Sequence, residues 1–177
     1  MAAVARAASA PDGTFVDNSR MTCLRCCNNF LCLRAFQVEA TLRTRDLLAP
    51  LASSATCAHE GVRGEWALLL RNMAAAVHSC RPDGFEDHAH YIAALLLPML
   101  HPSRGSHCSG EVQWNAALAL GTCLHILKTS SKGIGGGAAL ASEARAALLH
   151  LTTASLPSDS SPISALAHEA LQLLQPQ

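Results

Sequence analysis

The chain has 177 residues, enough for one domain with a substantial core, and half of them are apolar. Its 13 basic and 13 acidic residues cancel, and no run of Lys or Arg occurs, so it lacks the basic stripe with stacking aromatics that nucleic-acid binding needs. The longest apolar run, Tyr91 to Leu100, is about half of what a membrane-spanning helix requires. Composition therefore predicts a globular protein that binds neither nucleic acid nor a membrane.

The first residues do not resemble a secretory signal. Residues 1–18 contain Pro11, Asp12 and Gly13 and show no periodic pattern, so they are predicted to be a disordered leader before a domain at 19–177. Residues 1–10 lack a sustained hydrophobic core, which favours a cytosolic or nuclear protein with free thiols. An organelle-transit segment stays open, because Arg6 is present and no acid precedes Asp12.

Seven helices are predicted from apolar periodicity and from cap and turn residues. Ala and Leu dominate while aromatics make up only 4% of the chain, which favours helices over strands and predicts an all-α fold. Asn18 or Ser19 can cap the first helix, and Pro50 interrupts or ends the second. The predicted helices cover residues 19–33, 38–53, 60–79, 86–100, 111–128, 138–154 and 163–175.

The helix at 111–128 is the most informative, because it is apolar almost all round. Such a helix is typical of one packed between neighbours rather than wetted on one face. Gly121 lies inside it without a turn signal, so we expect a close approach of another helix there. The apolar residues of its main stripe are Val112, Ala116, Leu120, Cys123, Leu124 and Leu127.

Two helices share a pattern. Val62, Trp66, Leu70, Met73 and Val77 recur 50 residues later as Val112, Ala116, Leu120, Cys123 and Leu127, and Asn28 and Asn72 have similar surroundings 44 residues apart. Periods of about 40–50 residues in an all-helical chain are typical of armadillo and HEAT repeats. The sequence therefore predicts a right-handed armadillo- or HEAT-like solenoid of about three to four repeats.

The cysteines and histidines do not form a convincing catalytic or metal site. Cys23, Cys26, Cys27 and Cys32 lie in or at the end of one predicted helix, and no second Cys-x-x-Cys occurs, so buried or semi-exposed thiols are favoured over zinc. No phosphate loop, serine elbow or His-Glu-x-x-His motif is present. We therefore predict a non-catalytic protein without metal or cofactor, and keep a thiol or zinc redox module as a minor alternative.

The asparagines suggest a binding face instead. Asn28, Asn29, Asn72 and Asn115 lie within apolar helices, where an unpaired amide is costly. They could hydrogen-bond the backbone of an extended peptide, with Arg25 and Arg71 holding an acidic group. The alternative is that each amide bonds to a neighbouring helix or loop.

Three segments resemble the PUL domain, the C-terminal part of phospholipase A2-activating protein and its fungal relatives. They are Met21–Phe30, Trp66–Met73 and Trp114–Thr122, and the last, with its Ala-Leu-Gly-Thr core, is the most specific. Their order and spacing also fit over about residues 19–174. The resemblance implies an armadillo-like solenoid that binds the C-terminal tail of the hexameric AAA ATPase known as valosin-containing protein, as an adaptor in ubiquitin-dependent protein turnover.

The resemblance also implies a groove in which basic residues on inner helices hold an acidic, aromatic-bearing tail. Here we expect the tail to contact Trp114, Asn115 and Asn72, with Arg25 and Arg71 supplying charge. The chain departs from the family in three ways: Asn115 stands at a basic position, Arg25 lies one residue closer to Asn28 than the family's arginine is expected to, and the family's first helices have no counterpart. The alternatives are a generic armadillo scaffold for another partner, and the non-catalytic part of a thioredoxin- or peptidase-PUL fusion.

Overall fold

The computed structural model describes residues 17–100, 108–130, 138–153 and 162–175. Within these ranges the chain forms helices and no strand, which confirms the all-α prediction for this part. Of the predicted leader at 1–18, residues 1–16 lie outside the described ranges, while Asp17 and Asn18 belong to the first described helix. In chain order the elements are α2 (Asp17–Phe30), α3 (Arg34–Leu42), α4 (Thr44–Leu48), the 3-10 helix η1 (Ala49–Thr56), α5 (Glu60–Cys80), α6 (Phe85–Leu100), α7 (Gly110–Thr129), α8 (Ala138–Thr153) and α9 (Pro162–Leu173).

Six of the seven predicted helices are present, each within three residues of its predicted ends. The prediction of one helix over 38–53 is wrong, because that stretch is divided among α3, α4 and η1. Two threonine hydroxyls bond to the backbone near the first break: Thr41 donates to the carbonyl of Val38 at 2.8 Å and Thr44 to that of Thr41 at 2.9 Å. Such local bonds compete with a regular helix, and Pro50 at the start of η1 has no N–H to continue one.

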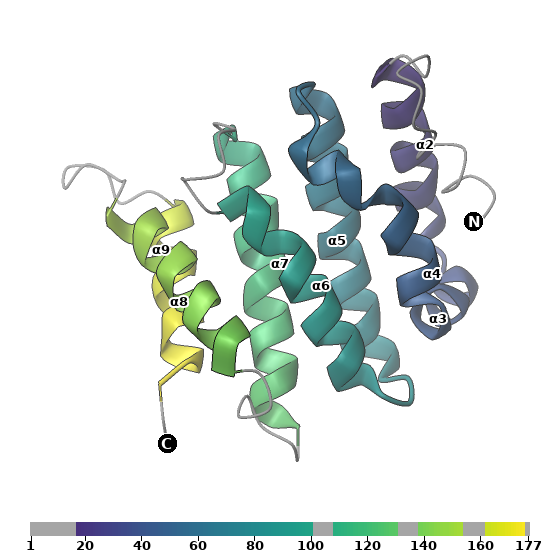
Figure 1. The fold of residues 1–177 in the computed structure, drawn as a ribbon. Coiled ribbons are helices and arrows are strands. Elements are labelled where there is room, and N and C mark those ends of the chain that lie inside the picture. Colours follow the sequence, from purple (N-terminus) through teal and green to yellow (C-terminus); the bar gives the residue numbers. More distant parts are fainter. Residues whose placement is uncertain (1–16, 101–107, 131–137, 154–161, 176–177) are drawn as a thin grey trace.

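The helices lie in two layers (Figure 1). Helices α2, α5, α7 and α9 lie side by side and run in the same direction, with α5 packed between α2 and α7, and α7 packed between α5 and α9. The second layer contains α4 with η1, then α6, then α8, which run the opposite way. Helix α3 lies at the α2 end of both layers. This arrangement leaves one surface of the α2–α5–α7–α9 layer without a covering layer.

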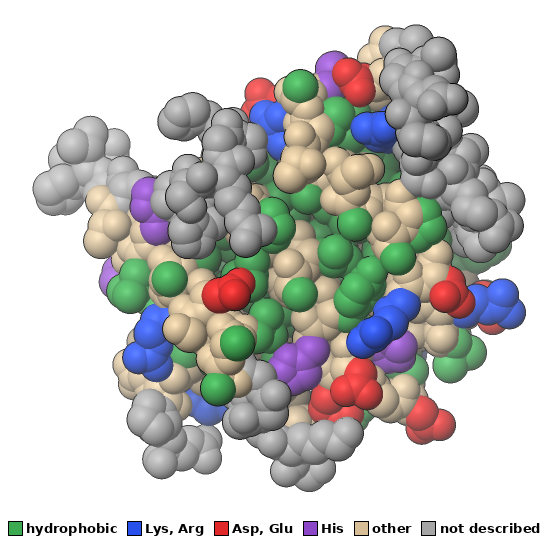
Figure 2. Space-filling view, in the orientation of Figure 1, with side chains coloured by type: hydrophobic (Ala, Val, Ile, Leu, Met, Phe, Trp, Pro, Cys, Tyr) green, Lys and Arg blue, Asp and Glu red, His purple; other side chains and the backbone are tan. Residues whose placement is uncertain are grey.

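The other surface belongs to the α4–α6–α8 layer (Figure 2). Charged side chains of both signs are scattered over it, without a stripe of a single sign. None of the helices in the described ranges is both long and apolar enough to cross a membrane.

The core follows the repeated pattern in the sequence. The ten residues of α5 and α7 that share the 50-residue spacing are each at most 1% exposed. Both helices are thus buried on several sides, as the all-round apolarity of 111–128 predicted.

Gly121 lies opposite α9. A methyl group added at Gly121 would sit 3.8 Å from Cβ of Ala170, which is ordinary van der Waals contact. The neighbouring helix expected at this glycine is therefore present, but it is not so close that only glycine fits.

Trp66 tests the packing of α5. Its side chain is fully buried, and its indole N–H has no hydrogen-bond partner among the described residues. We expect Trp66→Ala to lower the free energy of unfolding by about 3–5 kcal/mol, because it leaves a large cavity. Trp66→Phe should lower the free energy of unfolding clearly less, because the loss of volume is accompanied by the removal of a buried N–H donor that has no partner. Urea denaturation of both variants measures the difference, and equal losses would contradict this account.

Candidate functional site

The uncovered surface of the α2–α5–α7–α9 layer, here called the open face, is the strongest candidate for a functional surface. Helices α5 and α7 each leave only a narrow stripe partly accessible, since their flanks are covered by neighbours in the layer. The residues of these stripes follow helical spacing, so the polar side chains of α5 and α7 lie on one side of each helix. On α5 they include Gly64, Glu65, Leu68, Arg71, Asn72 and His78, and on α7 Trp114, Leu118, Gly121, Thr122 and His125.

Asn28 connects α2 to α5. Its side chain is 5% exposed, and its Nδ2 donates to the carbonyl of Glu65 at 3.1 Å and to Oε2 of Glu65 at 3.2 Å. Its Oδ1 accepts a bond from Nδ2 of Asn72 at 3.0 Å. The amide of Asn28 is therefore bonded at both ends within the protein, as a nearly buried amide requires.

Glu65 also holds Arg25. Nε of Arg25 lies 2.6 Å from Oε1 of Glu65, and the two side chains are 58% and 16% exposed. An ion pair with one partner this exposed adds little to stability, about 0–1 kcal/mol. It does reduce the positive charge that Arg25 presents to a ligand.

Arg71 connects α5 to α7. Its Nη1 donates to Oδ1 of Asn115 at 3.0 Å, and Asn115 is 6% exposed. A guanidinium carries five N–H donors, so this single bond leaves others on the half-buried side chain that can face a ligand.

Six of the seven predicted binding residues thus lie on or beside one surface formed by α2, α5 and α7. Asn28, Asn72 and Asn115 bond to neighbouring helices, as the alternative explanation of the asparagines had it. Trp114 is half-buried on the stripe of α7. Asn29 is the seventh: it is exposed, and the described part of the structure gives its side chain no hydrogen bond.

Sequence reasoning missed Glu65, although it joins Arg25 to Asn28. A signal was present, because Glu65 precedes Asn72 by seven residues and so lies on the same side of α5. The partner helix that it faces depends on tertiary packing, which spacing alone does not give.

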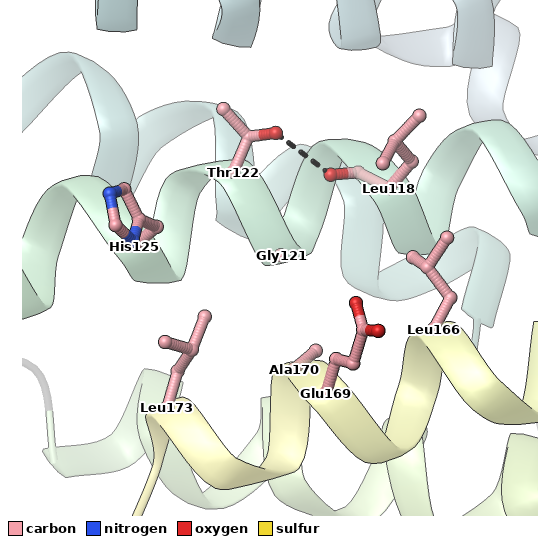
Figure 3. Close-up of a pocket in the computed structure, with 8 residues that line it drawn as sticks. All are labelled: Leu118, Gly121, Thr122, His125, Leu166, Glu169, Ala170 and Leu173. Carbon is pink, nitrogen blue, oxygen red and sulfur yellow. Dashed lines mark hydrogen bonds between the residues drawn. The ribbon is translucent and has the colours of Figure 1, made fainter.

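A groove between α7 and α9 was also missed (Figure 3). It encloses about 350 Å³ and is lined by small and apolar residues together with Glu169 and His125. The side chains of Leu166, Glu169 and Leu173 point from α9 toward α7. The hydroxyl of Thr122 donates to the carbonyl of Leu118 at 3.0 Å, so it is satisfied within its own helix. The groove can therefore accept an apolar side chain.

A second cavity, of about 250 Å³, lies where α5 and α7 begin. Its lining includes Arg25 and three acids, Glu60, Glu65 and Glu111. Because Glu65 is paired with Arg25, the two other carboxylates make this end of the open face acidic.

Along α5 and α7 the charge changes from the N-terminal end to the C-terminal end. Arg71 lies near the middle of α5, and at the C-terminal ends the rings of His78 and His125 meet edge to face with centroids 5.5 Å apart. Lys128 follows in the last turn of α7. Acids at helix N-termini and bases at C-termini both complement the helix dipole. The open face is therefore acidic at one edge and basic toward the other.

The described residues contain no group of three or more His, Cys, Asp or Glu side chains placed to hold a metal ion. Of the predicted cysteine cluster, Cys27 is buried, Cys23 is half-buried, and Cys26 and Cys32 are exposed. His101 and His107 lie outside the described ranges.

No family model matches the chain, and neither a curated protein nor a solved structure matches it. The resemblance to the PUL family therefore stays a prediction.

The hydrogen bonds of Asn28 with Glu65 and Asn72 predict a loss of stability when Asn28 is replaced. We expect Asn28→Ala to lower the free energy of unfolding by about 1–3 kcal/mol, because it leaves polar atoms of Glu65 and Asn72 without their partner. The adjacent Asn29→Ala is the control, and its effect should stay within about 0.5 kcal/mol since its side chain is exposed. Chemical denaturation of both variants tests this, and similar effects at the two positions would contradict it.

The buried thiols predict a loss of stability in alkali. Burial raises the pKa of the Cys123 thiol from 9.0 to about 12 and that of Cys27 to about 11. Above pH 9 the unfolded chain loses these protons while the folded protein keeps them, so the free energy of unfolding falls as pH rises.

The measurement is urea denaturation from pH 7 to pH 10.5. The free energy of unfolding of Cys123→Ala should fall less steeply with pH than that of the wild-type protein, although the variant is less stable at pH 7. Parallel curves for the two proteins would show that Cys123 does not contribute.

Proposed function

We propose that this chain is a non-catalytic, armadillo- or HEAT-like solenoid whose open face binds a peptide segment of another protein. The solenoid interpretation is supported by two antiparallel layers and by a constant register within one of them. At each of the three junctions of that layer, one hydrogen bond joins residues 44 apart: Asn28 with Asn72, Arg71 with Asn115, and Lys128 with Gln172. A fixed offset of this kind is what stacked repeats produce.

The observation that carries the binding proposal is the groove between α7 and α9 on the open face. Its volume of about 350 Å³ lies at the low end of ligand pockets, which suits one anchoring side chain better than a whole small molecule. Leu118, Leu166 and Leu173 supply apolar walls. Buried anchors of this kind dominate the binding energy of many protein interfaces.

Charge favours one placement of the peptide. Glu60 and Glu111 lie at the edge of the open face where α5 and α7 begin, and they repel an acidic segment. Arg71, with spare donors, and Lys128 lie farther along the same helices. An acidic peptide therefore lies across the middle and far part of the face, with an apolar or aromatic side chain in the groove and its own carboxylates directed toward Arg71 and away from Glu169, which lines the groove.

The specific partner that we propose is the C-terminal tail of the valosin-containing AAA ATPase, on the basis of the PUL resemblance. Binding this tail would make the chain an adaptor in ubiquitin-dependent protein turnover in the cytoplasm or nucleus. In this assignment Arg71 holds an acidic group of the tail, and Trp114 packs beside it. Arg25 has a smaller role, because Glu65 already neutralises it.

The test is a titration of a fluorescently labelled tail peptide with the full chain, followed by anisotropy. Arg71→Glu should weaken binding by about tenfold or more, because a charge-assisted contact becomes a repulsion. Gly121→Leu should weaken it as well, because the added side chain fills the groove. Circular dichroism melting curves establish that both variants fold.

Two matched controls lie on the other layer. Arg45→Glu makes the same charge reversal on α4, and Ala94→Leu adds the same kind of bulk at an exposed position of α6. Neither should change the affinity. Absence of saturable binding by the wild-type chain, or equal effects of controls and test variants, would refute the assignment of the tail.

A generic scaffold for another partner remains the second candidate, and one observation favours it. The open face is not strongly basic, since Arg25 is paired and Asn115 occupies a position that is basic in the PUL family. A ligand held by the groove alone would bind independently of Arg71 but would still be blocked by Gly121→Leu. The same set of variants therefore separates the two candidates.

A further inference from the structure

The α5–α7 and α7–α9 junctions of the open face are built alike but filled differently. Since the pattern of α5 recurs in α7 after 50 residues, Gly121 stands in α7 where Arg71 stands in α5. At the first junction the Arg71 side chain crosses to α7, where its Nη1 donates to Oδ1 of Asn115 at 3.0 Å. At the second junction Gly121 contributes no side chain, and it lines the groove of about 350 Å³. The groove therefore lies where an arginine side chain lies at the preceding junction.

The α9 side of the second junction carries an acid. The 44-residue register of the first junction also holds here, because Nζ of Lys128 donates to the carbonyl of Gln172 at 3.5 Å. In that register Ala165 corresponds to the amide acceptor of the first junction, and its methyl group accepts no hydrogen bond. Glu169 follows one turn later on the same side of α9, and its side chain points toward α7 (Figure 3). The acceptor at this junction is thus a carboxylate.

Glu169 lines the groove without a partner of its own among the described residues. It takes part in neither of the two ion pairs of this part of the chain, and no side-chain hydrogen bond reaches it there. The walls beside it are apolar and include Leu118, Leu166 and Leu173. The groove thus joins apolar walls to an unpaired negative charge, a combination that suits a long apolar stem ending in a cation.

We propose that the groove binds an arginine side chain of the peptide that lies on the open face. The proposal rests on the proposed function and specifies the residue that anchors the peptide best. The arginine stem packs against Leu118 and Leu173, and its guanidinium donates two parallel hydrogen bonds to the carboxylate of Glu169. The partner thereby supplies at the second junction the group that Arg71 supplies at the first.

The carboxylate of Glu169 makes the groove selective among anchors. A leucine or phenylalanine side chain contacts the same walls, but it displaces water from the carboxylate without replacing the lost hydrogen bonds. A lysine carries the charge without the planar fork that matches a carboxylate, so it binds more weakly than an arginine. An acidic side chain is repelled.

Acidic residues of the same peptide fit beside the groove. Asn115, which holds Arg71, precedes Gly121 by six residues, or about 9 Å along α7. An extended chain spans that distance in about three residues. A peptide with an acid about three positions from its arginine therefore pairs with both Arg71 and Glu169.

The first experiment compares short fluorescent peptides by anisotropy titration with the full 177-residue chain. Each peptide has one variable central residue, glutamates three positions before and after it, and glycine or serine elsewhere, so that either chain direction fits. The central residue is arginine, its uncharged isostere citrulline, leucine, phenylalanine or glutamate. The arginine peptide should bind at least about threefold more tightly than the citrulline, leucine and phenylalanine peptides, and the glutamate peptide should bind most weakly.

Variants at Glu169 test the same contact from the protein side. Glu169→Gln should weaken binding of the arginine peptide about three- to fivefold, since a partly exposed ion pair is lost, and should not weaken binding of the leucine peptide. Glu169→Arg should reverse the order, so that the glutamate peptide binds more tightly than the arginine peptide. Glu143→Gln is the matched control, because it removes an exposed acid from α8 and should change neither affinity.

A third experiment needs no peptide. Gly121→Arg places an arginine at the position equivalent to Arg71, and the added Cβ meets only ordinary contact there. Gly121→Gln is its control, with similar helix propensity and no charge. Gly121→Arg should melt about 1–3 °C above Gly121→Gln by circular dichroism, and this difference should disappear when both carry Glu169→Gln. Gly121→Arg should also abolish binding of the arginine peptide.

The outcomes separate this proposal from the proposed function. If the leucine or phenylalanine peptide binds as tightly as the arginine peptide, or if Glu169→Gln leaves the arginine peptide unaffected, the arginine anchor is wrong while peptide binding stands. The same holds if the labelled tail peptide binds and none of the short peptides does. If neither the tail nor any short peptide binds, both proposals fail. A melting difference that persists with Glu169→Gln would show that a guanidinium in the groove does not pair with Glu169.

Discussion

The packing of α5 against α7 determines where most of the other helices lie. On α5 pack α2, α3, η1 and α6, while α6 and α9 pack on α7. Both helices bury Leu, Ala and other apolar residues on three sides, and burying each large side chain contributes about 1.5–3 kcal/mol. The remaining side of each helix is too narrow for an ordinary polar face. The few polar side chains of α5 and α7 therefore lie close together on it.

That concentration explains why the asparagines bond to polar side chains of neighbouring helices. An amide on a narrow stripe beside an apolar flank lies partly out of water, where an unmade hydrogen bond is costly. Asn28, Asn72 and Asn115 meet this cost with partners from the next helix, and Glu65 bonds to both Asn28 and Arg25. The same bonds align neighbouring helices along their length. What remains for a ligand is Arg71, Trp114 and the groove beside them.

Much of the fold could be predicted because its signals are local. The ends of α5, α6 and α7 follow from apolar spacing and from turn residues such as Pro82 and Gly84, and the 50-residue recurrence identified two equivalent helices. The break into α3, α4 and η1 was hidden because Thr41 and Thr44 are compatible with a helical pattern. The helix ends at Leu42 because Arg43 leaves the helical conformation, with φ −123° and ψ 32°, which the apolar spacing does not reveal.

The candidate site also has one part that could be predicted from the sequence and another that could not. The 44-residue interval between Asn28 and Asn72 is visible in the sequence, and these residues do meet. Glu65 and the groove could not be predicted, because both depend on which helix lies opposite. Gly121 gave a partial signal: it marked the neighbourhood of α9 but not the empty volume between the helices.

The position of the groove has a mechanical consequence. Helix α9 is held on one side only, by α7 and α8, whereas α7 is enclosed by α5, α6 and α9. An outermost element with fewer neighbours opens locally at a lower free energy than an enclosed one. A peptide side chain that packs against Leu118 and Leu173 would therefore stabilise α9 against local opening. Occupancy of the groove would then be detected as slower amide hydrogen exchange in α9, at the edge of the protein rather than at its centre.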